Sequence, residues 1–336
     1  GLEDDRRTGA LALVRLLGFF LADLGVGVHA ARYPVGAGEL RRRGARADTL
    51  EVHDLAVSAP ALPWTPTPGA PLAITRARHG LMAYNPHDMY IGRSVERYGE
   101  FGELELDLMR AAVPEAGVVV DVGANIGTHT VAMARHVGPN GIVLAFEPQR
   151  AVHGILTTNV TLNGLGWVHL VHAGVGARRD EMLLPDYRYD KDTNFGAIPM
   201  QAAERGWPVR VVPLDDYLWL PAVHLVKIDV EGMEPQVLDG AHAFLAKYRP
   251  VLFVENDRES TSVPVLTRLL DLGYRVYWHV VPLYRADNWG RDPENLFPGN
   301  GSINVLCIPR EREQHVVGFP EMTDPAAPPP VALAPF

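Results

Sequence analysis

Residues 118–129 read Val118-Val119-Val120-Asp121-Val122-Gly123-Ala124-Asn125-Ile126-Gly127-Thr128-His129. A run of β-branched residues ends in an acid, a glycine-rich turn follows, and residues 127–137 then have the pattern of a helix. This order of strand, tight turn and helix N-terminus is the one that a nucleotide-type ligand needs. Glycine at 123 and 127 lets the backbone come close to a ligand and to the next helix, where a Cβ atom would collide.

The second strand of this unit, residues 142–146, ends at Glu147. An acid about 20 residues beyond the glycines is placed to accept hydrogen bonds from ribose hydroxyls. The turn has the pattern Asp-x-Gly-x-Asn-x-Gly, which lacks the third glycine of a dinucleotide turn. The sequence therefore predicts a nucleoside-type site between the turn and Glu147, and it disfavours an NAD-dependent dehydrogenase.

Strands and helices alternate from Val118 onward, which predicts a parallel sheet with helices on both faces and right-handed crossovers. Ligands of such sheets bind beyond the carboxyl ends of the strands. Four acids each close an apolar strand: Asp121, Glu147, Asp229 and Glu255. We expect these acids to lie along one edge. The last two strands, residues 274–278 and 303–308, need no helix between them and predict a closing antiparallel hairpin, where a dehydrogenase would run a further parallel unit.

Composition excludes several classes of protein. The 336 residues are 47% hydrophobic and 21% charged, as in an ordinary globular protein. A net charge of -9 provides no basic surface for nucleic acid or for an anionic membrane. The single cysteine, Cys307, allows no disulfide within the chain, which fits a cytoplasmic setting. The apolar stretch 11–28 carries Arg15 and Asp23, so we interpret it as an amphipathic or buried helix and not as a membrane span or signal.

The sequence divides into three parts. Residues 1–70 predict an N-terminal helical appendage and a Pro-rich linker, a candidate for homodimerisation, for docking a partner or for covering the main domain. Residues 71–319 hold the sheet domain, in which residues 174–213 interrupt the alternation as an antiparallel insertion that either shapes a substrate pocket or is a plain surface loop. Residues 320–336 predict a Pro-rich flexible tail.

Three motifs together resemble the FkbM family of S-adenosylmethionine-dependent methyltransferases: Val120–Gly127, Phe146-Glu147-Pro148 and the run Lys227-Ile228-Asp229-Val230-Glu231-Gly232-Met233-Glu234. The segments 85–98 and 256–257 are similar to the family as well, and the likeness covers roughly residues 80–310. The resemblance implies an α/β class I methyltransferase fold, which is a Rossmann-like, doubly wound, seven-stranded sheet with a C-terminal antiparallel hairpin. It also implies mostly O-methylation of sugars and natural products, with some members acting on peptide nitrogen.

The resemblance also implies roles for individual residues. Gly123, Asn125 and Gly127 would form the turn around the amino-acid part of S-adenosyl-L-methionine, with Asp121 preceding them. Glu147 would bind the ribose. Asp229 would lie beside the methylsulfonium, at the end of the fourth strand.

Methyl transfer needs an in-line arrangement of nucleophile, methyl carbon and sulfur, and a weakly acidic hydroxyl benefits from a base or a cation. The candidates for that task are Asp229, Glu231, Glu255 and His279. Paired carboxylates such as the first two can share a hard cation such as Mg²⁺. The alternatives are that Glu231 caps the next helix and that His279 is only a hydrogen-bonded structural residue.

Candidate substrate-binding residues flank this centre. Glu255 and Asn256 lie at a strand end, and Tyr90, Arg93, Glu96 and Tyr98 lie in the segment before the first parallel strand, where they could form a lid or merely a surface. His129, in the first turn of the helix after the glycines, is a further candidate for contacting cofactor or substrate.

The leading hypothesis is an O-methyltransferase acting on a small-molecule hydroxyl in natural-product biosynthesis. The second is N-methylation of a peptide side chain or backbone amide, with residues 1–70 docking a leader peptide. The third is a scaffolding module without turnover, which the intact strand-end acids and glycine turn argue against. None of these hypotheses involves a nucleic acid or a membrane as partner.

Overall fold

The structure of the chain is a computed structural model that describes residues 72–185, 188–196, 198, 206–313 and 316–330. The predicted helical appendage and linker at residues 1–70 lie outside the described residues and stay predictions. No helix in the described ranges is long and apolar enough to cross a membrane.

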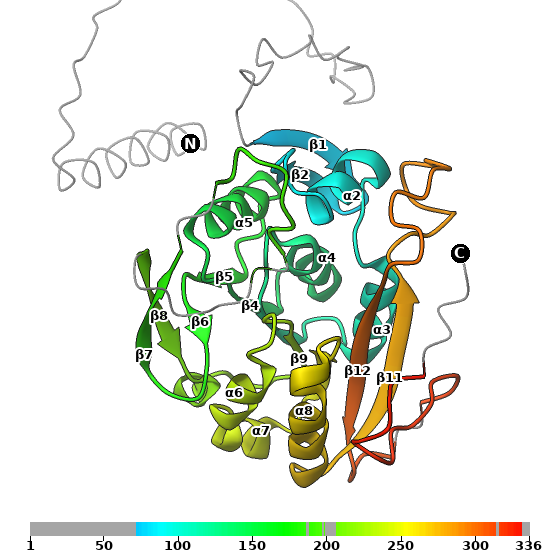
Figure 1. Cartoon of the computed structure of the whole chain (residues 1–336). Helices are drawn as coiled ribbons and strands as arrows, with labels where there is room; N and C mark the ends of the chain where they lie inside the picture. Colours follow the sequence, from blue (N-terminus) through cyan, green and yellow to red (C-terminus); the bar gives the residue numbers. More distant parts are fainter. Residues whose placement is uncertain (1–71, 186–187, 197, 199–205, 314–315, 331–336) are drawn as a thin grey trace, which may run out of the picture. The chain divides into compact units, whose positions relative to one another are not determined.

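The central element is a seven-stranded sheet (Figure 1). Its strands, in spatial order, are β11 (Tyr274–Pro282), β12 (Gly301–Pro309), β10 (Val251–Glu255), β9 (Leu225–Ile228), β3 (Val118–Val122), β4 (Ile142–Phe146) and β5 (Val168–Val171). β12 pairs antiparallel with both of its neighbours, and the other pairs are parallel. The predicted doubly wound sheet with a closing antiparallel hairpin is therefore confirmed.

Helices cover both faces of the sheet (Figure 1). They are α2 (Ile91–Tyr98), α3 (Glu103–Ala112), α4 (Thr128–Val137), α5 (Arg150–Leu162), α6 (Glu234–Asp239), α7 (His242–Tyr248), α8 (Glu259–Asp271) and the short 3₁₀ helix η3 (Leu214–Tyr217). Val119 packs in one hydrophobic cluster with residues of α3, α4 and α5, whereas Val120 packs in the other with residues of α6, α7 and α8. All five residues of β3 are buried, since a parallel strand between two helical layers has no solvent-facing side.

Two smaller sheets flank the central one. β1 (Ala73–Ala77) and β2 (Gly80–Tyr84) form an antiparallel hairpin ahead of the segment that holds Tyr90 and Arg93. β6 (Gly174–Val175), β8 (Trp207–Val212) and β7 (Asp180–Leu184) form a three-stranded sheet in that order, with β7 and β8 antiparallel. The antiparallel insertion predicted within residues 174–213 is thereby confirmed. Residues 186–187, 197 and 199–205 of this insertion lie outside the described residues.

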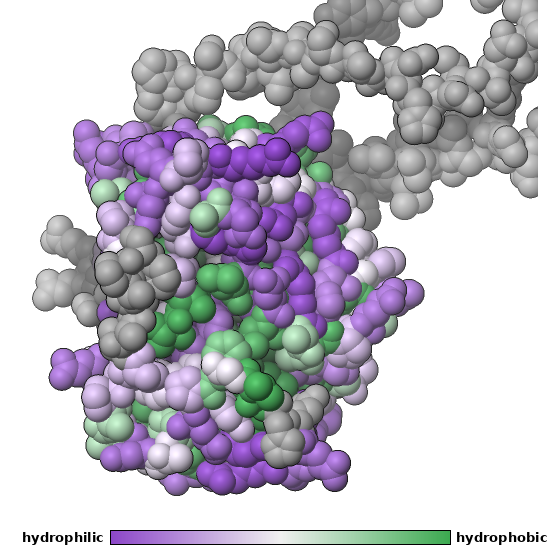
Figure 2. Space-filling view, turned by 90° about the vertical axis from the view of Figure 1, so that its right-hand side faces the viewer, coloured by the Kyte–Doolittle hydropathy of each residue, from purple (hydrophilic) through white to green (hydrophobic). Residues whose placement is uncertain are grey.

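The start of the C-terminal segment pairs with the sheet edge at β11. The Trp278 N–H donates to Pro320 O at 3.0 Å, and the Met322 N–H donates to Val276 O at 2.8 Å. Met322 is buried, with 4% of its surface exposed. Figure 2 shows the side of the molecule that carries this edge, where apolar residues collect across the middle and hydrophilic residues lie above and below. These first residues of the predicted flexible tail therefore differ from expectation, because they occupy an edge that would otherwise expose unpaired backbone groups.

Gly123 allows the end of β3 to pass close to the end of β9. It adopts a φ of +83°, and a Cβ atom at this position would lie 1.8 Å from the Asp229 carbonyl oxygen. Gly127 has a φ of +91°, and its Cβ would lie 2.5 Å from Leu156 Cδ1 on α5. Both glycines are thus required by protein atoms in this structure, in addition to any ligand.

Replacing Gly123 with alanine should lower the free energy of unfolding by at least about 3 kcal/mol, because a positive φ and a backbone clash combine at one residue. Urea denaturation would measure the loss. Gly154→Ala is the matched control: Gly154 lies in α5, and no atom lies within 4 Å of the place where its Cβ would be, so alanine there should be neutral or stabilise by up to about 1 kcal/mol. Equal stability of the two variants would contradict the steric argument.

Candidate active site at the strand ends

A cavity of about 330 Å³ opens at the carboxyl ends of the central strands. This volume falls within the range of small-molecule sites. Its wall includes the turn residues Gly123 and Asn125, the strand-end acids Glu147, Asp229 and Glu255, and residues 300–304 around the start of β12. The predicted alignment of acids along one edge is correct for these three. Asp121 and Gly127 are not part of the wall and support it from behind.

Glu147 holds the glycine turn against the end of β4. Its carboxylate accepts the Asn125 N–H at 3.0 Å and the Gln149 N–H at 2.8 Å. Asn125 itself has a φ of +50°, a conformation that asparagine tolerates better than most residues. Burial raises the pKa of Glu147 to about 7 even though both N–H groups oppose the shift. The carboxylate is therefore preorganised at the position where the sequence places a ribose.

Lys227 lies beneath the cavity with its side chain 5% exposed. Its Nζ is 3.3 Å from Asp121 Oδ1 and 3.1 Å from Asp229 Oδ2, and it donates to the Gly123 carbonyl at 3.1 Å. Burial opposes the charged ammonium, but the two carboxylates outweigh it and raise the pKa of Lys227. Thr130 Oγ1 donates to the other oxygen of Asp121 at 2.6 Å. Sequence reasoning assigned Lys227 no role, although it is the one charged residue inside the apolar strand 225–228.

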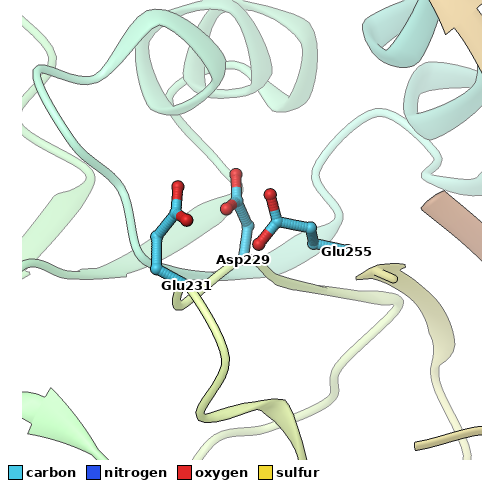
Figure 3. A group of neighbouring side chains, drawn as sticks. All are labelled: Asp229, Glu231 and Glu255. Carbon is cyan, nitrogen blue, oxygen red and sulfur yellow. The ribbon is translucent and has the colours of Figure 1, made fainter. Parts of the chain in front are cut away.

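Three carboxylates meet at the other end of the cavity (Figure 3). Asp229 lies between Glu231 and Glu255, with one oxygen of each within 4.8 Å of the others. Glu231 pairs with Arg258, yet burial and Asp229 raise the pKa of Glu231 to about 7. Burial and the neighbouring carboxylates raise the pKa of Glu255 well above its usual range, and its Oε2 has no hydrogen-bond partner among the described residues.

Glu231 does not cap the following helix, which was the alternative to a role in the site. The N–H groups of Val230 and Gly232 donate instead to Glu234, at 3.1 and 3.0 Å. Glu231 adopts a φ of +58° at the tip of this turn, with its carboxylate beside Arg258 and on the cavity wall.

Besides Asp121 and Gly127, three further predicted site residues do not lie on the cavity wall: Arg93, Asn256 and His279. Arg93 is exposed on α2, and Asn256 is buried and donates to Ser262 Oγ at 2.9 Å. His279 is 2% exposed and lies between the rings of Phe253 and Phe319, at centroid distances of 5.5 and 5.3 Å. His279 is therefore packed among aromatic rings away from the cavity, which does not fit a direct catalytic role. Its Nδ1 has no hydrogen-bond partner among the described residues, so the hydrogen-bonded structural role is not seen either. Of the predicted substrate contacts, Tyr90 and Glu255 do line the cavity.

The strand order of the central sheet, with one antiparallel strand in the last-but-one position, defines a class I methyltransferase fold. Residues 121–276 match the family described as the methyltransferase FkbM domain. Over this segment the chain is similar to the FkbM methyltransferases, and the resemblance seen in the motifs is confirmed there.

Individual proteins are also similar to this chain. Methyltransferase 1 of Beauveria bassiana (strain ARSEF 2860) is 32% identical over 152 residues, which cover 39% of this chain and 60% of that protein. The solved FkbM methyltransferase of Methylobacillus flagellatus KT is 19% identical, with a TM-score of 0.38 over 57% of this chain and 43% of its own. Fibrillarin of Aeropyrum pernix, solved with bound S-adenosyl-L-methionine, is 15% identical, with a TM-score of 0.37 over 73% of this chain and 85% of its own. The chain thus spans about 60% of the length of the curated relative.

The pH dependence of stability should reveal the buried carboxyl of Glu147. Because the pKa of Glu147 is raised to about 7, the stability it contributes is complete below the ordinary pKa of glutamate and is lost as the pH rises through 7. Glu147→Gln removes this loss, so between pH 5 and pH 8 the variant should gain about 2–3 kcal/mol relative to the native protein. Urea denaturation at both pH values measures the difference. Glu181→Gln, at an exposed position of β7, is the control, and a Glu147→Gln difference independent of pH would contradict the assignment.

Proposed function

We propose that this protein is an S-adenosylmethionine-dependent methyltransferase that methylates a hydroxyl of a sugar or other natural product. The observation that carries the proposal is the arrangement of Glu147, the glycine turn and Asp229 along one cavity. Bound S-adenosyl-L-methionine would supply a methyl group already activated by positive sulfur. The protein then has to bind the cofactor and the acceptor, orient them for in-line transfer and exclude water.

The residues of the cavity fit such a cofactor. Glu147 offers carboxylate lone pairs to ribose hydroxyls, and Phe146, Val175 and Met233 supply apolar wall at the same end. The Asp229 side chain is 35% exposed and faces the cavity, with its other side fixed by Lys227. A carboxylate in this position stabilises a sulfonium and loses that attraction once the sulfur becomes neutral.

The second candidate acceptor is a peptide side chain or a backbone amide. The same cofactor residues would serve an N-methyltransferase, so the acceptor and the methylated atom have to be identified from the product. The remaining parts of the proposal are a cytoplasmic setting, a homodimer and the absence of a nucleic acid or a membrane as partner.

Cofactor binding tests the first half of the proposal. S-adenosylhomocysteine should bind the native protein in isothermal titration calorimetry at tens of micromolar or below. Glu147→Ala should weaken that binding about 10- to 100-fold, because hydrogen bonds to a charged group contribute about 1.5–3 kcal/mol. Glu181→Ala should leave the affinity unchanged. Undiminished affinity of Glu147→Ala would place the ribose elsewhere.

A divalent cation is the second part of the proposal. Asp229, Glu231 and Glu255 present the oxygen ligands that Mg²⁺ prefers, and such an ion would satisfy the unpartnered Glu255 oxygen.

A mass-shift screen identifies the acceptor: the protein is incubated with S-adenosylmethionine and candidate hydroxyl or peptide acceptors, and products heavier by one methylene are sought.

With the acceptor that the screen identifies, Mg²⁺ should raise turnover at least about tenfold over EDTA, since a bound cation stabilises developing negative charge on oxygen. Glu255→Gln should abolish this response, whereas Glu259→Gln, at an exposed position of α8, should keep it. Equal turnover in EDTA and in Mg²⁺ would show that the three carboxylates act without a metal.

A further inference from the structure

A second buried cluster lines the same cavity and was not singled out as a unit by the sequence. Glu105 of α3 lies 3.1 Å from His129 Nε2 of α4 through its Oε2. Its Oε1 accepts hydrogen bonds from Ser302 Oγ and, at 3.2 Å, from Asn304 Nδ2, both on β12. All four side chains are on the cavity wall. Three elements distant in sequence thus converge on one carboxylate.

The carboxylate of Glu105 is fully compensated in this cluster. Its side chain is only 10% exposed, and burial alone would raise its pKa. The interactions with His129 and Ser302 outweigh burial and lower the pKa of Glu105 to about 2. Glu105 is therefore an anion at neutral pH and holds its neighbours by charge-assisted interactions.

The Glu105 carboxylate orients the His129 ring through Nε2 and leaves Nδ1 without a contact to it. Nε2 is buried, and the Glu105 carboxylate is its one ion-pair partner among the described residues. This contact lies off the line of an ideal hydrogen bond. Nδ1 has no hydrogen-bond partner in the same part of the chain. The loop between α2 and α3 packs against the imidazole: a Cβ atom on Gly102 would lie 2.2 Å from Nε2, and the ring of Phe101 lies 6.3 Å away. With an Nε2–H directed at Glu105, Nδ1 carries a lone pair that is left for the acceptor.

The other candidate bases named for the cavity either form ion pairs with cationic side chains or lie beside like charges that oppose their ionisation. Asp229 is paired with Lys227, and Glu231 is paired with Arg258. Glu255 lies beside both of these carboxylates, so its ionisation is opposed by two like charges. An imidazole next to a fixed anion accepts a proton without creating an isolated buried charge.

The cluster lies at the acceptor end of the cavity. β12 is four positions from β4 in the sheet, which corresponds to about 19 Å at the usual strand spacing. In the proposed function Glu147 at the β4 end would bind the ribose, and Asp229 after β9 would lie beside the sulfur. The space beside Ser302 and Asn304 is then left for the acceptor.

We infer that His129 is the general base that takes the proton of the acceptor hydroxyl, and that Glu105 is the positioning residue that orients its imidazole. This inference rests on the proposed function. The hydroxyl proton passes to Nδ1 as the oxygen–carbon bond forms and the carbon–sulfur bond breaks, with sulfur keeping the electron pair. The imidazolium is stabilised by Glu105 and later releases its proton to water. Lys227 on β9 and His279 on β11 are the other titratable groups that act on Glu105.

The kinetic test uses the acceptor that the mass-shift screen identifies. His129→Gln keeps an amide nitrogen near the position of Nε2 but has no basic nitrogen, so kcat should fall about 10²- to 10⁴-fold. The KM for the acceptor and the affinity for S-adenosylhomocysteine should change less than about threefold. Glu105→Gln should lower kcat by a smaller factor than His129→Gln does. It should also move the acidic limb of the pH–rate profile to lower pH, because the Glu105 carboxylate no longer stabilises the imidazolium of His129. His169→Gln, at an exposed position of β5, should match the native protein.

A second measurement needs no acceptor. The full chain labelled with ¹⁵N in its histidine rings, with S-adenosylhomocysteine bound, should show His129 with a protonated Nε2 and an unprotonated Nδ1 at pH 8, assigned by loss of the signal in His129→Gln. Glu105→Gln should abolish this tautomer preference. A protonated Nδ1, or a His129→Gln variant with more than half the native kcat, would overturn the inference. Failure of the native protein to bind S-adenosylhomocysteine would instead refute the proposed function.

Discussion

The ammonium group of Lys227 is the interaction on which the site depends. It joins Asp121 at the end of β3, Asp229 just beyond β9 and the carbonyl of Gly123 in the turn between them. Two carboxylates so close together in a buried setting would repel each other without a cation between them. Because Lys227 also fixes the Gly123 carbonyl, the same charge determines the course of the turn and the direction of Asp229.

The fold was predictable because its signals are local in sequence. Each buried parallel strand is a continuous apolar run, and each run ends in an acid that marks the carboxyl edge of the sheet. The glycine turn after Asp121 reports a backbone conformation that other residues avoid, and the structure confirms positive φ at Gly123 and Gly127. The same logic located Glu147, Asp229 and Glu255 on the cavity wall. The closing hairpin followed from the missing helix before β12.

The missed parts of the site depend on packing between distant segments. Glu105 and Ser302 are 197 residues apart and meet only because α3 lies over the start of β12. No sequence periodicity in either segment predicts the contact between Glu105 and Ser302. His279 illustrates the reverse error: it follows a strand in the sequence, as a site residue would, but β11 is the outermost strand of the central sheet, and there the ring packs between Phe253 and Phe319. Residues 320–322 pair with β11 and cover backbone groups that the edge of the sheet would otherwise expose. The Pro-rich composition of the segment does not reveal this pairing.

Two glutamates on one cavity wall differ in charge because their partners differ. Glu105 receives hydrogen bonds from Ser302 and Asn304 and faces His129, so burial does not neutralise it. Glu255 faces other carboxylates, and burial together with their charge favours its protonated form. Environments that separate the pKa values of like groups are how a single site obtains distinct acid and base functions. The three carboxylates are therefore suited to take up positive charge, and the neighbouring pair of Glu105 and His129 is suited to take up a proton. Lys227 holds Asp229 in an ion pair.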